Sequence, residues 1–256
     1  MNIDKITAYY NKFNEDKRLT TRHGMVEFLT AMTYIHKYLN DDTKILDIGA
    51  GTGAYSVPLY QEGYDVTAVE LVKHNLRRIQ SKAPHLKAYQ GNAIDLSRFE
   101  DSTFDLVLLF GPMYHLMSFE EKCQALSEAK RVLKDGGHIM ISYCMNEYAI
   151  IQHGFRDGFI KQSVEHHHVD QNYHVLPKGN ELYSYVRIED INHLKDALQL
   201  KRKKMIAQDG FAEYMKKEIN HMDDDSFTYF MEYHYSTCER PELLGFSRHV
   251  LDILSK

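Results

Sequence analysis

Three glycines at alternate positions, Gly49, Gly51 and Gly53, follow a short apolar run and precede a helix-compatible segment. Glycine lacks a Cβ atom and readily adopts positive φ, so a turn built from glycines can pass close to a ligand. The spacing G-x-G-x-G differs from the G-x-G-x-x-G of dinucleotide-binding loops. Taken alone, the loop is as consistent with simple turn chemistry or another nucleotide fold as it is with a cofactor-binding loop. Asp47, two residues ahead of Gly49, is expected to brace the loop through backbone N–H groups.

A second group of chemically capable side chains follows the apolar segment 104–110. Tyr114 and His115 stand a few residues beyond its end. Histidine can accept a proton near neutral pH, and a tyrosine hydroxyl can donate or accept a hydrogen bond. Two interpretations stay open: a pair that faces a substrate, or aromatic packing beneath a helix. These two residues are the catalytic candidates, and the sequence assigns no general base.

The chain has fifteen histidines, and three of them, His166, His167 and His168, are adjacent, with His153 and His174 nearby. Adjacent side chains point to opposite faces of a strand and fan apart on a helix, so three in a row do not converge on one ion. We therefore expect solvated or substrate-lining histidines and no metal site.

Composition sets the outer limits. The chain has 256 residues, 43% of them hydrophobic, which suits one large α/β domain or a domain with an added lobe. A net charge of -5 gives no general attraction to nucleic acid or anionic lipid, so DNA and membrane are not expected partners and RNA is disfavoured. No signal-type segment or run of about twenty apolar residues occurs, which predicts a cytoplasmic protein. Cys123, Cys144 and Cys238 are widely spaced, which predicts reduced, buried thiols.

The elements that position the candidate groups alternate between strand and helix. Residues 4–39 have a helical period with a break at 18–24. Strands are expected from residue 44 and over 65–70, 86–91, 104–110 and 138–143, and helices after the glycine loop and over 75–81 and 119–133. Residues 134–137 have the composition of a helix C-cap. Five strand-helix steps predict a parallel, doubly wound sheet with right-handed crossovers.

Beyond residue 146 the alternation stops, which predicts an inserted lobe over 147–188. Two β-prone runs, 173–176 and 181–186, flank a turn-type sequence and suggest a hairpin. A helix over 188–198, a strand over 201–207, one or two helices over 211–238 interrupted by three aspartates at 223–225, and a strand over 249–254 complete the chain. The predicted division is a helical cap at 1–40, a core at 41–146, a lid lobe at 147–188 and the rest of the core at 189–256.

In this order, the elements resemble those of class I S-adenosylmethionine-dependent methyltransferases, of the small-molecule type with an N-terminal helical cap. The resemblance covers residues 44–143 well and implies a mostly parallel seven-stranded Rossmann-like sheet. It implies that the loop 47–53 wraps the methionine part of S-adenosylmethionine. Glu70, which ends the second strand, would accept hydrogen bonds from both ribose hydroxyls, and Leu71 would pack against adenine.

Two further positions depart from the family pattern. The family commonly has aspartate and a small residue after the third strand, where this chain has Asn92 and Ala93. The asparagine carbonyl and the Ala93 N–H can still recognise adenine. After Phe110 the chain reads Gly-Pro-Met-Tyr. Many methylases that act on nucleic-acid bases have an amide or acid residue at the start of this motif, and its absence here argues against a base methylase.

The resemblance implies a cap and lid that cover the crevice and form the acceptor pocket, with Tyr9, Tyr10, Arg18 or Arg22 as contributors from the cap. One of these arginines would bind the cofactor carboxylate. The complete set of expected cofactor-binding residues is Asp47, Gly49, Ala50, Gly51, Gly53, Glu70, Leu71, Asn92, Ala93, Phe110 and Arg22.

The expected function is methyl transfer from S-adenosylmethionine to a small-molecule acceptor by in-line displacement, in which positioning and exclusion of water supply most of the acceleration. The alternatives are an RNA or protein methyltransferase, and a non-catalytic module that binds S-adenosylmethionine or NAD.

Overall fold

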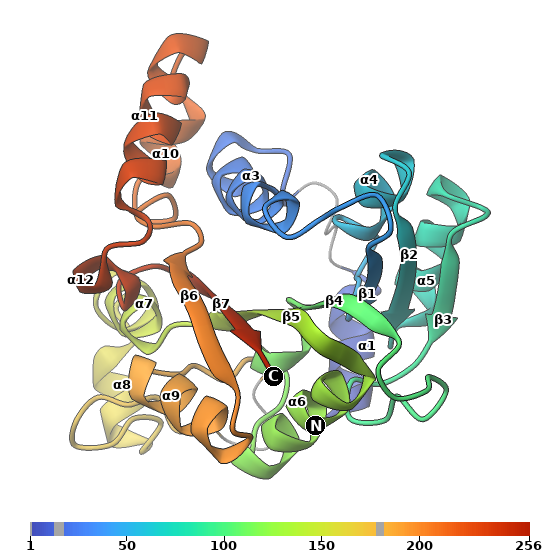
Figure 1. Cartoon of the computed structure of the whole chain (residues 1–256). Coiled ribbons are helices and arrows are strands. Elements are labelled where there is room, and N and C mark those ends of the chain that lie inside the picture. Colours follow the sequence, from blue (N-terminus) through green and yellow to red (C-terminus); the bar gives the residue numbers. More distant parts are fainter. Residues whose placement is uncertain (1, 13–17, 178–181) are drawn as a thin grey trace.

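The computed structural model describes residues 2–12, 18–177 and 182–256, which form a central sheet with helices on both faces (Figure 1). Within these ranges the sheet has seven strands in the order β3-β2-β1-β4-β5-β7-β6. They are β1 Lys44–Ile48, β2 Asp65–Glu70, β3 Lys87–Gln90, β4 Phe104–Leu109, β5 Leu133–Cys144, β6 Lys201–Ala207 and β7 His249–Ser255. Strands β1 to β5 run parallel, whereas β7 is antiparallel to both of its neighbours. The predicted α/β fold, a doubly wound and mostly parallel sheet, is confirmed.

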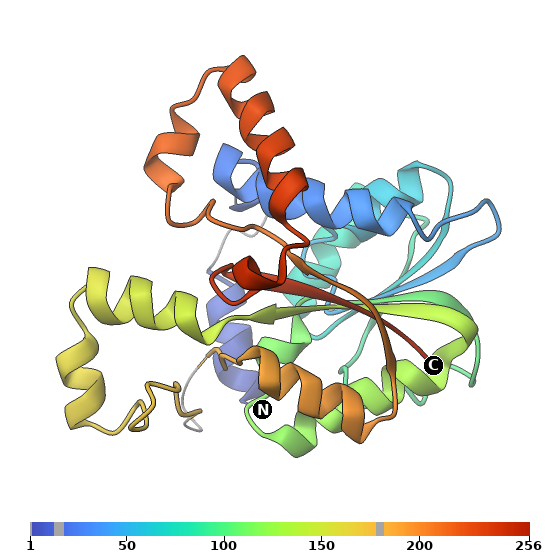
Figure 2. The ribbon, with the colours of Figure 1, turned by 60° about the vertical axis from the view of Figure 1, so that its left-hand side comes forward.

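Helices cover both faces because the central strands are apolar on both sides. Strand β4, with the sequence FDLVLL, is buried at every position except its aspartate, as expected for a strand packed on two faces. Helices α3 Arg22–His36 and α4 Ser56–Gln61 lie on one face of the sheet, and α6 Phe119–Val132 and α9 Ile188–Ala197 lie on the other (Figure 2). Helix α5 Lys73–Lys82 packs against β2 and β3.

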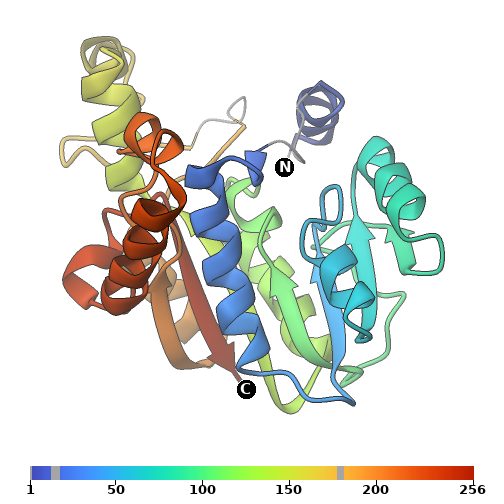
Figure 3. The same ribbon diagram turned by 90° about the horizontal axis from the view of Figure 1, so that it is seen from above.

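Helix α1 Ile3–Tyr10 is set apart from these layers. It lies beyond the end of the sheet toward which β2 points (Figure 3). Asn2 caps its first turn by accepting a hydrogen bond from the Lys5 N–H, and Ile6 is its one buried side chain. The N-terminal segment is therefore placed at the carboxyl ends of the parallel strands, where ligands bind in open α/β sheets.

The loops that follow β1 and β4 touch each other where the strand order reverses. Gly49 has φ +73°, and a Cβ atom there would lie 2.6 Å from Cδ of Pro112. A Cβ atom on Gly111 would lie 3.0 Å from the Gly49 carbonyl oxygen. The Gly49 N–H donates to the Val69 carbonyl oxygen at 2.8 Å, which ties the same loop to β2. Two glycines thus allow three strand ends to converge.

The boundary between α6 and β5 differs from the prediction. The helix starts with a capping box between Ser118 and Glu121 and ends at Val132, because Leu133 is extended and pairs with Phe104. Residues 134–137, predicted to be a C-cap, belong to β5. Gly136, at φ +81°, lies where the register with β4 shifts.

The segment after β5 forms an outlying lobe of α7 Asn146–Ala149, a π-helix Ile150–Arg156 and α8 Ile160–Glu165 (Figure 2). The predicted hairpin is wrong for the residues that the structure describes; residues 178–180 of its predicted turn, 177–180, and residue 181 lie outside them. Val175 bridges Val169, and Val186 bridges Met145. The Val186 N–H donates to the Cys144 carbonyl oxygen at 3.0 Å, so this segment extends the sheet beside the end of β5. The division into cap, core and lid stays a prediction.

The C-terminal helices are α10 Lys216–Asn220, α11 Asp224–Thr237 and α12 Pro241–Leu244, of which α12 was not predicted. Helices α10 and α11 pack on α3 around a small apolar cluster. Asp223 caps α11 by accepting from the Ser226 N–H, which explains the aspartate run.

All three thiols are unpaired in the described part of the chain. Cys144 and Cys238 are buried as predicted, and Cys123 is only partly so. No described helix combines the length and the apolar character needed to cross a membrane.

Replacing Gly49 by alanine tests the contact between the two loops. The variant must adopt positive φ and must also overlap Pro112, so we expect a loss of unfolding free energy of about 3 kcal/mol. Gly136→Ala is the matched control, because Gly136 also has positive φ, but no atom lies within 4 Å of the place that its Cβ atom would take. It should lose only about 1 kcal/mol in urea denaturation. Equal losses in the two variants would contradict the proposed contact.

Candidate active site

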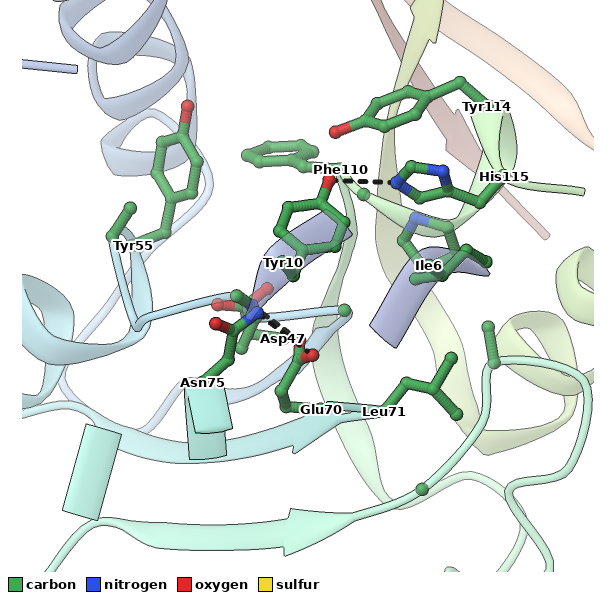
Figure 4. Close-up of a pocket in the computed structure, with 18 of the residues that line it drawn as sticks. Ile6, Tyr10, Asp47, Tyr55, Glu70, Leu71, Asn75, Phe110, Tyr114 and His115 are labelled. Atoms are coloured by element: carbon green, nitrogen blue, oxygen red, sulfur yellow. Dashed lines mark hydrogen bonds between the residues drawn. The ribbon is translucent and has the colours of Figure 1, made fainter. Parts of the chain in front are cut away.

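A cavity of about 890 Å³, counted to its open mouth, lies at the carboxyl ends of β1, β2 and β4. Its wall combines the glycine loop, the residues after β2, β3 and β4, and side chains from the N-terminal segment (Figure 4). Most of the residues predicted from the sequence meet here. They are Asp47, Gly49, Ala50, Gly51, Glu70, Leu71, Asn92, Ala93, Phe110, Tyr114 and His115.

Glu70 joins the end of β2 to the glycine loop. Its Oε2 accepts a hydrogen bond from the Gly51 N–H at 2.8 Å, and its Oε1 accepts from the Val72 N–H at 2.8 Å. The Asn75 amide approaches Oε1 at the longer distance of 3.4 Å. Because a carboxylate offers about four acceptor sites, these three bonds leave about one site for a ligand, and about two if the ligand displaces the distant Asn75 amide. Burial raises the pKa of Glu70 to about 7, although these hydrogen bonds favour the ionised form.

Asp47 anchors the residue that follows the glycine loop. The Ser56 hydroxyl donates to Asp47 Oδ2, and the Ser56 backbone N–H also bonds to this carboxylate, so Asp47 holds the first turn of α4 through one side-chain and one backbone donor. Burial raises the pKa of Asp47 to about 6. Asp47 and Glu70 are therefore both buried carboxyl groups in the cavity wall, next to the glycine loop.

Two of the expected cofactor residues lie elsewhere. Gly53 does not line the cavity; it has positive φ, and its lack of a Cβ atom allows close packing against Val57 and Ile79. Arg22 points away, because α3 begins there and its guanidinium donates to the Met222 carbonyl oxygen and the Asp224 carboxylate. The helical periodicity of the sequence could not show whether Arg18 or Arg22 lines the cavity.

Arg18 is the arginine that lines the cavity. Its guanidinium donates to both carboxylate oxygens of Glu27, one of them at 3.1 Å. Glu27 is also close to His249, with His249 Nδ1 lying 3.5 Å from Glu27 Oε2 and 2.7 Å from Asp209 Oδ2. Asp209 accepts a further hydrogen bond from the Ser247 hydroxyl at 2.6 Å. This buried network connects the N-terminal segment to the ends of β6 and β7.

The network is balanced in charge. Burial by itself would lower the pKa of His249, but the negative charges of Glu27 and Asp209 have the larger effect, so the pKa is raised to about 10. Burial raises the pKa of Glu27, but the positive charges of Arg18 and His249 bring it below its ordinary value. Glu27, Asp209 and His249 present ligand-type atoms within 4.8 Å of one another. Two carboxylates and two cations sum to zero, so this cluster requires no metal ion. Sequence spacing carried no sign of it.

Tyr10 and His115 meet across the cavity (Figure 4). His115 Nδ1 lies 2.9 Å from the Leu182 carbonyl oxygen, which can only accept, so Nδ1 carries the proton. Nε2 is then an acceptor, and the Tyr10 hydroxyl donates to it at 2.9 Å. Burial lowers the pKa of His115 to about 4, although the bond to Leu182 opposes this. His115 is therefore neutral at physiological pH.

Aromatic rings surround this pair. The Tyr183 ring lies 5.2 Å from His115 and 5.7 Å from Tyr114, and Tyr9 lies 6.2 Å from Tyr183. Tyr183 belongs to the segment 147–188, which was expected to contribute to the acceptor pocket, but the sequence did not single out this residue.

The histidine tract lies elsewhere. His153 pairs with Asp157 at 3.1 Å, and His166 donates to the Gln162 carbonyl oxygen at 3.0 Å. None of the residues that line the described cavity comes from the tract.

The charge network should make stability depend on pH. The folded pKa of His249, about 10, lies above the value near 6.5 of an unfolded histidine, so its contribution is complete below pH 6.5 and is lost as pH rises toward 10. His249→Gln should lose about 3 kcal/mol of unfolding free energy at pH 6, and this loss should shrink by pH 9.5.

His36→Gln is the control, since His36 forms an exposed pair with Glu62 at 2.7 Å. It should change the unfolding free energy by less than about 1 kcal/mol at either pH. A loss for His249→Gln that is independent of pH would contradict the charged network.

The protonation state of His115 can be observed directly. Long-range ¹H–¹⁵N spectra of histidine-labelled protein should show a proton on Nδ1 and none on Nε2 at pH 8. The signals should stay unchanged down to about pH 5, because the pKa is about 4, whereas an unperturbed histidine titrates near 6.5. Assignment through His115→Phe identifies the signals. A proton on Nε2 would overturn the tautomer.

Residues 46–141 match a family described as a methyltransferase domain. Among curated proteins, a demethylmenaquinone methyltransferase of Lactiplantibacillus plantarum is 33% identical over 150 residues, which covers 54% of this chain and 59% of that protein. A mouse eEF1A lysine and N-terminal methyltransferase is 29% identical over 143 residues, which covers 52% of this chain and 20% of that protein. The chain spans less than two thirds of either relative.

Solved structures with this fold cover the whole chain. A methyltransferase from Thermotoga maritima, described as a possible histamine N-methyltransferase, has a TM-score of 0.62 and 18% identity over 100% of both chains. A geranyl diphosphate C-methyltransferase from Streptomyces coelicolor has a TM-score of 0.59 and 14% identity, and covers 99% of this chain and 97% of that one. The glycine loop and the strand-end glutamate lie within the residues that match the methyltransferase domain, and the solved structures show that the chain as a whole has the fold of S-adenosylmethionine-dependent methyltransferases.

Proposed function

We propose that the chain transfers the methyl group of S-adenosylmethionine to a small-molecule acceptor held between the carboxyl ends of the strands and helix α1. The observation that carries this proposal is the Glu70 carboxylate, which lies in the same cavity as the glycine loop and keeps acceptor capacity beyond its bonds to Gly51 and Val72. A ribose has two adjacent hydroxyl donors, which match this capacity.

The residues present fit the cofactor. Gly49 and Gly51 line the cavity without side chains that would fill it, and Leu71, Asn92 and Ala93 line its wall beyond Glu70. We assign adenine to these last three residues and the cofactor carboxylate to Arg18, which replaces Arg22 in this role. A guanidinium has five N–H donors and binds carboxylates in a forked geometry, so Arg18 can serve a second carboxylate beside Glu27.

Bound S-adenosylmethionine supplies an activated methyl group on a positively charged sulfur. The protein's part is to hold the acceptor in line and to keep water out. Ile6 and Leu19, both buried, line the cavity together with Tyr10 and restrict access from the N-terminal side. This cover supports a small acceptor over a macromolecule, and the net charge of -5 supports the same choice over RNA.

Binding of S-adenosylmethionine should depend on Glu70 and on pH. The ionised carboxylate is the form that accepts from both hydroxyls, and burial raises its pKa to about 7. Affinity in calorimetry should therefore fall about tenfold from pH 8 to pH 6. Glu70→Gln should weaken binding at least about tenfold at pH 8 and remove most of the pH dependence.

Glu165→Gln, at an exposed position on α8, is the control and should bind like the wild type. Tight binding of NAD, or unchanged binding by Glu70→Gln, would reject the cofactor assignment. A screen of small molecules, peptides and RNA for release of S-adenosylhomocysteine then tests the acceptor class, and turnover with peptide or RNA alone would reject a small acceptor.

A further inference from the structure

The hydrogen bond between Tyr10 and His115 is the starting point for an inference that rests on the proposed function. His115 Nδ1–H is committed to the Leu182 carbonyl oxygen, so Nε2 presents a lone pair to the cavity. The group that meets this lone pair is the phenol of Tyr10, at 2.9 Å. The cavity thus contains one aromatic hydroxyl, supplied by the protein, that donates to a neutral imidazole.

The orientation of His115 is held by the backbone on both sides of it. The Ser184 N–H donates to the Tyr114 carbonyl oxygen at 2.7 Å, and the Ser184 hydroxyl donates to the Leu116 carbonyl oxygen at 3.0 Å. The buried Lys122 ammonium donates to the Ser184 hydroxyl at 2.9 Å. These bonds join the segment that carries Leu182 to the segment that carries His115. The imidazole cannot rotate without losing its bond to Leu182, so the lone pair keeps its direction.

The surroundings of Nε2 suit a flat, neutral ring. The rings of Tyr10, Tyr114 and Tyr183 lie 4.8 to 5.6 Å from that of His115. Each carboxylate among the described residues that line the cavity already has a use: Asp47 accepts from Ser56, Glu27 accepts from Arg18, and the remaining acceptor capacity of Glu70 is assigned to the ribose in the proposed function. An ammonium group would therefore find no further carboxylate among these described residues, whereas a neutral hydroxyl needs only the lone pair.

We infer that the acceptor is a hydroxylated aromatic compound, that its hydroxyl takes the place of the Tyr10 phenol, and that His115 Nε2 receives the hydroxyl proton. In the reaction the acceptor oxygen forms a bond to the methyl carbon, the bond between that carbon and sulfur breaks with its electron pair left on sulfur, and the O–H proton passes to Nε2. The positive charge that begins on sulfur ends on the imidazole, so charge and atoms balance. Helix α1 must shift to withdraw Tyr10 when the acceptor binds.

The test uses p-cresol, which reproduces the tyrosine side chain, and toluene, which has the same ring and methyl group without the hydroxyl. The binding of either compound can be measured without methyl transfer. In Tyr10→Ala, calorimetry should show p-cresol binding at least about tenfold more tightly than in the wild type, where Tyr10 occupies the position. It should also bind at least about tenfold more tightly than toluene.

In the double variant Tyr10→Ala, His115→Phe, the preference for p-cresol over toluene should fall below about twofold. If this variant does not fold, the ¹⁵N signal of His115 Nε2 in Tyr10→Ala serves instead, and it should shift on addition of p-cresol and not of toluene. Equal binding of p-cresol and toluene to Tyr10→Ala would overturn the inference, as would tighter binding of benzylamine than of p-cresol.

Binding of S-adenosylmethionine to the wild-type protein separates the two proposals. No such binding in the wild type, with p-cresol binding to Tyr10→Ala intact, would count against the proposed function. Equal binding of p-cresol and toluene with cofactor binding intact would count against the acceptor class alone.

Discussion

The site depends on one buried carboxylate that joins two strand ends. Glu70 is the last residue of β2 and accepts a hydrogen bond from the Gly51 N–H in the loop after β1. The loop is therefore fixed by a carboxylate that also keeps acceptor capacity for a ligand. Burial and backbone donors act on this group in opposite directions, and its pKa near 7 is the result. In the proposed function, the same carboxylate that shapes the loop also binds the ribose with its remaining acceptor sites.

Around this centre the protein uses two separate devices to bring distant segments together. The balanced charges of Arg18, Glu27, Asp209 and His249 connect the N-terminal segment to the C-terminal strands. Removing one member would leave a charge buried without its partner, so the network is strong only as a whole. On the other side, the segment around Ser184 holds His115 by backbone hydrogen bonds. The charge network positions the charged wall of the cavity at Arg18, and the segment around Ser184 positions the neutral, aromatic wall at His115.

The two walls suit the two parts of a methyl transfer. The wall formed by Glu70 and Arg18 offers the charges that a polar cofactor needs, and the wall formed by His115 and its tyrosine neighbours offers a single directed lone pair among rings.

The sequence alone determined the order of strands and helices in the core, because continuous apolar runs and glycine turns are local signals of buried parallel strands. For the same reason it located the glycine loop and Glu70, which depend on positions within one strand-turn-helix unit. It failed where partners lie far apart along the chain. The start of β5 was placed five residues too late because pairing between Leu133 and Phe104 overrode a local C-cap pattern, and the hairpin failed because Val186 pairs beside β5. The choice of Arg18 over Arg22, the charge network with His249, and the tautomer of His115 were decided only by tertiary structure. Each depends on a partner 9 to 200 or more residues away, and no local pattern in the sequence records such a contact.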